Sequence, residues 1–120
     1  MNFNCLFDAL GAYTRYNGYQ MRDIICNHLA RNPVLGEGGI RASYITQWDA
    51  DDLESYVEHM RDPMTWGGET EILTFANLFH SRVYVHMQGA KPLVYTPLRD
   101  HKHTIHVHYT GNHYEILGRS

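Results

Sequence analysis

One cysteine near the start of the chain and a histidine–glutamate pair near its end have the residue types that nucleophilic catalysis requires. Cys5 begins a segment with helical spacing, where the free N–H groups of a first turn favour a thiolate over a thiol. His113 and Glu115 are two apart in an expected strand, so their side chains leave the same face. A carboxylate beside an imidazole orients it and stabilises its protonated form. The three residues therefore indicate a Cys/His/acid triad with Cys5 as nucleophile and His113 as base.

A purely structural interpretation of the same residues stays open at this point. Free cysteine is among the most buried residue types, so a core position also explains Cys5. The polar face of an exposed strand also explains His113 and Glu115. The second cysteine, Cys26, shares an apolar helix face with Leu29 and is expected to be structural.

Five of the nine histidines crowd into the last third of the chain: His101, His103, His106, His108 and His113. His106 and His108 share a strand face, and a His-x-His pair can chelate a transition metal. No Cys-x-x-Cys or His-Glu-x-x-His pattern accompanies them. We therefore expect a solvated strand face here rather than a metal site, and no cofactor.

Two further features allow both a packing and a binding interpretation. Trp48 and Trp66 would suit ligand platforms, although packing at a helix start explains Trp66 equally well and Trp48 more simply. An acidic cluster has either a helix-capping and solubility role or a basic partner. Its members are Asp49, Asp51, Asp52 and Glu54.

The composition predicts one domain, 1–120. The chain has 120 residues, 43% hydrophobic and 19% charged, which is typical of a globular protein with one core. Two cysteines are too few for a disulfide framework and suit a reducing compartment. A formal charge of −3 with nine titratable histidines does not require nucleic acid. Because the sequence has no apolar run of about 18 residues and no basic signal-peptide start, we expect a cytoplasmic protein without a membrane partner.

The periodicity of apolar residues predicts helices first and strands last. Helical spacing predicts helices over 4–15, 19–31, 49–60 and 69–79. Asn4 is the expected N-cap of the first helix, and Gly18 is expected to break it. Alternation with period two predicts strands over 83–87, 93–96, 105–109 and 113–117. The result is an α+β domain with N-terminal helices packed on a mostly antiparallel sheet.

The segment 4–10, Asn-Cys-Leu-Phe-Asp-Ala-Leu, resembles the nucleophile motif of the ovarian-tumour (OTU) family of papain-like cysteine proteases. Other blocks are similar to family motifs in the same order. Residues 21–25 resemble its second helix, and 56–60 the stretch before its active-site loop. Residues 66–69 resemble its Trp-Gly-Gly helix start, and 112–115 its histidine motif. Together these blocks cover almost the whole chain.

The resemblance implies the papain-like OTU fold and a deubiquitinase, which hydrolyses isopeptide bonds after the C-terminal Gly-Gly of ubiquitin or a ubiquitin-like modifier. Cys5 would attack, His113 would return the proton to the leaving amine, Glu115 would orient His113, and backbone N–H groups around Asn2 to Cys5 would receive the oxyanion. The expected substrate-binding residues are Trp66, Gly67, Gly68, Glu69, Asn112 and Tyr114. We expect a monomer in the cytoplasm, or in a host's cytosol if the source is a virus or bacterial pathogen, with ubiquitin or a ubiquitin-like protein as partner.

Three positions depart from the family pattern. Asn2 stands where an aspartate is usual, Phe3 where a glycine is usual, and Glu115 where aspartate or asparagine is expected. Cys5 also lies only four residues from the first residue, which predicts an oxyanion loop with little upstream support, in a fragment of a larger protein or a minimal family member. The alternative function is therefore a catalytically weak or inactive OTU-fold domain that binds ubiquitin.

Overall fold

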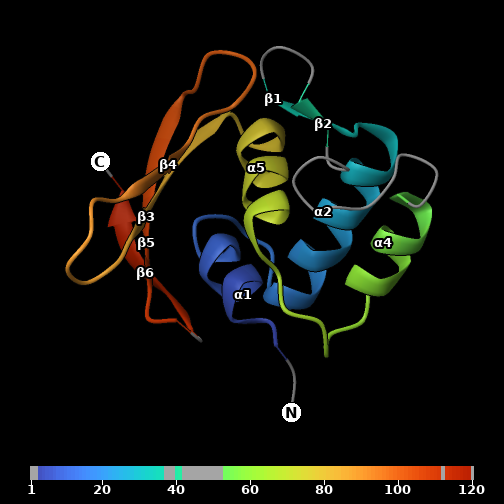
Figure 1. Ribbon diagram of the computed structural model, residues 1–120, viewed down its shortest axis with the longest axis horizontal. Coiled ribbons are helices and arrows are strands. Elements are labelled where there is room, and N and C mark those ends of the chain that lie inside the picture. The colour runs from blue at the N-terminus through green and yellow to red at the C-terminus, as the bar shows by residue number, and fades with distance from the viewer. Residues whose placement is uncertain (1–2, 37–39, 42–52, 112, 120) are drawn as a thin grey trace.

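The computed structural model describes residues 3–36, 40–41, 53–111 and 113–119, in which helices come first and the main sheet last (Figure 1). The helices are α1 (Cys5–Gly11), α2 (Gly18–Arg31), α4 (Leu53–Met60) and α5 (Glu69–Leu78). The strands are β1 (Val34–Gly36), β2 (Ile40–Arg41), β3 (Ser81–His86), β4 (Leu93–Tyr95), β5 (His103–Tyr109) and β6 (Tyr114–Arg119). This order confirms the expected α+β fold. Trp48 and residues 49–52 of the acidic cluster lie outside the described residues.

The main sheet has the strand order β4-β3-β5-β6, while β1 and β2 form a small sheet of their own. The pairs β3–β4 and β5–β6 are antiparallel, which confirms a mostly antiparallel sheet. β3 and β5 are parallel, because the chain leaves β3 for one edge strand, β4, and then crosses to the other side of β3. β6 is consequently the opposite edge strand, and it packs against α1.

The core lies between the sheet and the helices. Figure 1 shows α1 and α5 next to the sheet, with α2 and α4 on the side away from it. β3 and β5 bury alternate residues, as period-two alternation predicts. These buried strand residues are Val83, Val85, Ile105 and Val107. Cys26 of α2 is 0% exposed in the same core, which confirms its structural role.

The first helix is shorter than its spacing predicts. It ends at Gly11 rather than near Arg15, and Gly18 does not break it but begins α2. A capping box starts α2 at Gly18: the Asn17 side chain accepts from the Gln20 N–H, and the Gln20 side chain accepts from the Asn17 N–H, both at 2.9 Å. Gly18 has no room for a side chain, since a Cβ would lie 1.9 Å from Asp8 Oδ1.

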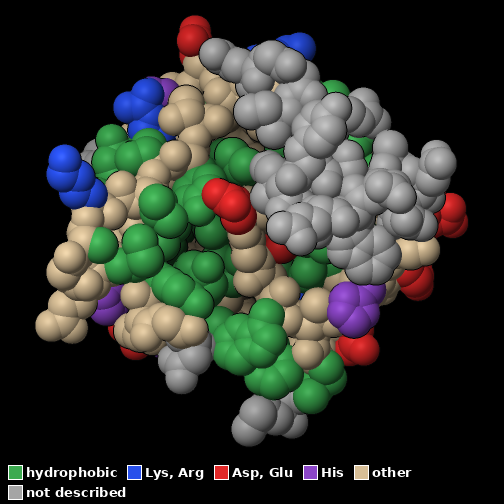
Figure 2. Space-filling view, viewed as in Figure 1, with side chains coloured by type: hydrophobic (Ala, Val, Ile, Leu, Met, Phe, Trp, Pro, Cys, Tyr) green, Lys and Arg blue, Asp and Glu red, His purple; other side chains and the backbone are tan. Residues whose placement is uncertain are grey.

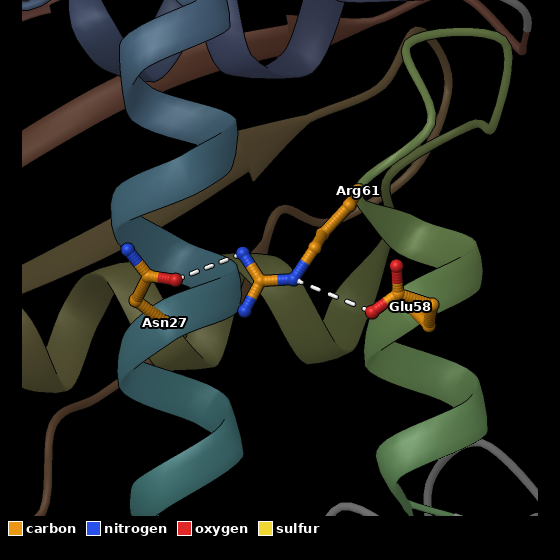
Figure 3. A network of polar contacts seen from close by, with 3 residues as sticks. All are labelled: Asn27, Glu58 and Arg61. Carbon is orange, nitrogen blue, oxygen red and sulfur yellow. Dashed lines mark hydrogen bonds and ion pairs between the residues drawn. The ribbon is translucent and has the colours of Figure 1, made fainter.

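A polar network on the surface connects α4 with α2 (Figure 3). Arg61 Nη1 donates to Asn27 Oδ1 at 2.8 Å, and Arg61 Nε lies 3.9 Å from Glu58 Oε2. The exposed ion pair contributes little to stability, and the Arg61–Asn27 hydrogen bond is the contact of this network that reaches α2.

None of the helices that the structure describes is long and apolar enough to cross a membrane.

Candidate active site

Segments from the two ends of the chain border one groove, which lies between α1 and the start of β6. Its α1 wall consists of Cys5, Asp8 and Ala9, and residues 113–116 form the other wall. Cys5 is the first residue of α1 and is half-buried, and unlike Cys26 it does not belong to the hydrophobic core. A nucleophilic side chain and an imidazole thus border the same open space.

His113 and Glu115 contact each other at the groove. His113 Nε2 lies 3.7 Å from Glu115 Oε1, and the two side chains are 52% and 57% exposed. This distance lies beyond hydrogen-bond range. The Glu115 carboxyl group and the His113 imidazole therefore form a loose contact that is open to water.

Tyr114 is a neutral neighbour of the nucleophile. Its ring lies 4.6 Å from that of Tyr109, its partner across the β5–β6 ladder. Burial raises the pKa of Tyr114 to about 12, and the nearby Tyr109 and Cys5 groups shift it in the same direction. At neutral pH the phenol keeps its proton, so Tyr114 adds no negative charge beside Cys5.

Tyr13 joins the end of α1 to the strands that lead to the histidine. Its hydroxyl accepts from the Gly118 N–H at 2.8 Å and lies 2.6 Å from the carbonyl oxygens of His106 and Gly118, to which it can donate. These groups flank an irregularity in the β5–β6 register between His106 and Val107. The hydroxyl therefore contacts backbone groups of both strands beside the bulge. Sequence reasoning missed Tyr13, because no spacing signals a contact between residues 105 apart.

The residues before Cys5 are attached to the segment after α4. The Phe3 N–H donates to Pro63 O at 2.7 Å, and the Phe3 ring stacks on Trp66 with centroids 4.4 Å apart. Trp66 remains 47% exposed. Figure 2 shows a group of hydrophobic side chains near the N-terminal end of the chain. Trp66 thus both packs and keeps an accessible surface.

Asn4 occupies the N-cap position of α1, as expected, but it does not cap the helix. Its side chain makes no capping hydrogen bond and is 1% exposed. Asn4 Oδ1 instead accepts from Arg22 Nε at 2.9 Å. The sequence pattern predicted the position of Asn4 at the helix start, but not that its side chain binds Arg22, a buried arginine of α2.

The Trp-Gly-Gly turn packs against the nucleophile helix. A Cβ on Gly67 would lie 2.8 Å from Phe7 Cε2 and 2.9 Å from Leu6 Cδ2, so the turn approaches α1 too closely for a side chain. The Gly68 N–H donates to Glu71 Oε1 at 2.7 Å. This single bond starts α5, because Gly68 has no side chain with which to complete a capping box.

Glu71 is a buried acidic residue in the first turn of α5. It is 1% exposed, and its Oε2 accepts from the Tyr56 hydroxyl at 2.6 Å. Burial raises the pKa of Glu71, against the hydrogen bonds from Tyr56 and Gly68 that lower it. Glu71 thus connects α4, the glycine turn and α5.

Two histidines contact each other on the outer face of the sheet. His86 Nε2 lies 2.8 Å from His106 Nδ1, and Tyr84 lies against the His106 ring. Within the described ranges, no group of three His, Cys, Asp or Glu side chains is arranged to hold a metal ion.

Comparison with known proteins identifies the family. The model of the OTU-like cysteine protease family matches residues 4–114, nearly the whole chain. The chain belongs to the OTU-like cysteine protease family. A search of curated proteins found no match.

Solved OTU domains share this fold. A structure of an OTU domain in complex with ubiquitin aligns with a TM-score of 0.73 at 19% identity, covering 96% of this chain and 63% of the other. The OTU protease of Taggert virus aligns with a TM-score of 0.68 at 18% identity, covering 99% of this chain and 75% of the other. A Wolbachia pipientis OTU deubiquitinase bound to ubiquitin aligns with a TM-score of 0.60 at 16% identity, covering 99% of this chain and 93% of the other. This OTU domain therefore spans less than two thirds of the first of these chains.

The OTU fold brings together some of the residues expected at the site and not others. The groove contains Cys5 and residues 113–116, and so includes Tyr114 beside the expected His113 and Glu115. Residues 66–69 do not line this groove, and their role in substrate binding stays a prediction. Asn2 and Asn112 lie outside the described residues.

Proposed function

We propose that this OTU domain is a cysteine protease that releases ubiquitin or a ubiquitin-like modifier from its conjugates. The observation that carries the proposal is the shared groove, which is bordered by Cys5 from one end of the chain and by the His113–Glu115 pair from the other. Two of the aligned OTU structures contain ubiquitin, which supports it as the partner class. We also propose that the protein acts as a cytoplasmic monomer without nucleic acid, membrane or cofactor.

The proposed chemistry is acyl transfer through a thioester. His113 takes the Cys5 proton, and the sulfur attacks the carbonyl carbon of the modifier's terminal glycine. Backbone N–H groups beside Cys5 would stabilise the oxyanion, and His113 would then return its proton to the leaving lysine amine. Water, deprotonated by His113, hydrolyses the thioester and restores the thiol. Glu115 would orient His113 throughout.

A catalytically weak or inactive ubiquitin-binding domain is the second candidate. The observation that favours it is the loose His113–Glu115 contact of 3.7 Å between two half-exposed side chains. The residues Phe3 and Asn2, where the family usually has glycine and aspartate, point the same way.

Ubiquitin carrying a C-terminal propargylamide distinguishes the two candidates. We expect the wild type and a Cys26→Ala control to form the covalent adduct, and Cys5→Ala to form none. With a fluorogenic ubiquitin substrate, His113→Ala should abolish turnover. Ordinary ubiquitin binding without an adduct would overturn the protease and establish the binding domain, and a panel of di-ubiquitin linkages would then define the preference of an active enzyme.

A further inference from the structure

Arg22 of α2 is a buried cation close to the nucleophile. Its side chain is 1% exposed, and its guanidinium lies 4.3 Å from the centre of the Phe7 ring. Burial lowers the pKa of Arg22, although an arginine keeps its charge in proteins. A buried charge is costly unless its donors are satisfied, so the partners of this guanidinium indicate its purpose.

The guanidinium binds neutral oxygens. Nε donates to Asn4 Oδ1 at 2.9 Å, Nη1 to Met60 O at 2.8 Å, and Nη2 to Phe3 O at 3.0 Å. A longer contact of 3.4 Å joins Nη2 to Pro63 O. Among the described residues, no carboxylate lies within ion-pair distance of Arg22. Its planar set of donors therefore binds main-chain oxygens and the Asn4 side chain rather than pairing with an acid.

The oxygens belong to two segments that meet beside the nucleophile. Phe3 and Asn4 directly precede Cys5, whereas Met60 and Pro63 lead from α4 toward the glycine turn. A backbone hydrogen bond from Phe3 N–H to Pro63 O, 2.7 Å long, joins the same segments. Arg22 thus braces the chain before Cys5 from within the fold.

We propose that Arg22 is a positioning residue of the active site, which holds the Phe3 carbonyl and the Asn4 side chain so that the Cys5 thiol stays in the groove with His113. The inference rests on the proposed function, since it assigns Arg22 a part in that reaction through Cys5. Lysine keeps the charge but lacks the planar fork of donors, so it cannot bind Asn4, Phe3 and Met60 together. Arg22→Lys should therefore displace Phe3 and Asn4, the two residues that form the Cys5 lead-in.

The test compares Arg22→Lys with Arg61→Lys, a matched control in which the replaced arginine also links α2 and α4 but lies outside the Cys5 lead-in. With a fluorogenic ubiquitin substrate, well below each protein's Tm, Arg22→Lys should lower kcat by about tenfold or more and leave KM nearly unchanged. Arg61→Lys should have the kcat and KM of the wild type. Combining Arg22→Lys with Asn4→Ala should give a smaller loss than the product of the two single losses.

A second readout does not depend on ubiquitin. The pH profile of Cys5 alkylation by iodoacetamide should change in Arg22→Lys and not in Arg61→Lys. If Arg22→Lys fails to unfold cooperatively, Asn4→Ala should show the same changed profile. A wild type that alkylates at Cys5 but turns over no ubiquitin substrate overturns the proposed function alone. An Arg22→Lys protein with wild-type kcat and alkylation profile, or independent effects of Arg22→Lys and Asn4→Ala, overturns the positioning role.

Discussion

The Tyr13 hydroxyl and the backbone of Gly118 bond to each other in both directions: Gly118 N–H donates to it at 2.8 Å, and the Gly118 carbonyl lies 2.6 Å from it. One side chain after α1 thereby holds β6, the strand with Glu115, against the helix with Cys5. The distance between the two halves of the proposed site is thus controlled outside the groove.

Tyr13→Phe tests this connection. The substitution keeps the ring but leaves the Gly118 N–H without its partner, so we expect the free energy of unfolding to fall by about 1–3 kcal/mol. Tyr109→Phe is the control, because the Tyr109 hydroxyl bonds only to exposed Gly111 O in the described contacts. This substitution should lower the free energy of unfolding by less. Urea unfolding of both variants measures the difference. Equal losses would show that the bulge does not need the hydroxyl.

Gly67→Ala should destabilise the protein, whereas Gly68→Ala should not. A Cβ at Gly67 would meet Phe7 and Leu6 below 3.0 Å, and relieving such a contact costs about 1–3 kcal/mol. A Cβ at Gly68 would meet nothing within 4 Å. Thermal unfolding distinguishes the two, and the reverse order of Tm values would contradict the packing of this turn on α1.

Glu71 should make stability depend on pH. Because burial raises its pKa above the ordinary 4.5, the folded protein holds the proton more tightly than the unfolded chain. Its contribution to stability is therefore fully present below that value and is lost as pH rises through the folded-state pKa. The unfolding free energy of the wild type minus that of Glu71→Gln should fall as pH rises above 4.5. A rising difference would show that the hydrogen bonds from Tyr56 and Gly68 outweigh burial.

The two cysteines should differ in reactivity. Burial raises the pKa of Cys26 to about 12, and its side chain is 0% exposed, whereas Cys5 borders the groove. Iodoacetamide at neutral pH should modify Cys5 in the native protein and both cysteines in denaturant, as read by mass spectrometry. Rapid native modification of Cys26 in Cys5→Ala would contradict the core position.

Glu115→Ala should reduce activity only moderately. The His113–Glu115 pair is more than half exposed, and exposed pairs are worth up to about 1 kcal/mol, so kcat/KM should fall less than about tenfold. His113→Ala should abolish turnover under the same conditions. Similar, small losses in both variants would remove these two residues from their proposed roles.

Local sequence patterns determined most of the framework. Period-two alternation predicted β3, β5 and β6 within a residue or two, and the apolar stripe predicted α4. Spacing also placed Cys5 at the start of α1 and Cys26 in the core. These features depend on which face of one element is apolar, and that information lies within a short stretch of sequence.

Tertiary structure alone decided how the site is held. The burial of Glu71, the parallel pairing of β3 with β5, and the partners of Tyr13 and Arg22 all depend on segments distant in sequence. A polar side chain in a local pattern looks solvated, because its pattern does not show the oxygen or N–H that another element will bring to it. The sequence by itself predicted that a cysteine begins a helix and that a histidine lies in the last strand, although β6 begins one residue later, at Tyr114. Only folding brought them to one groove, because β6 pairs at the sheet edge beside α1.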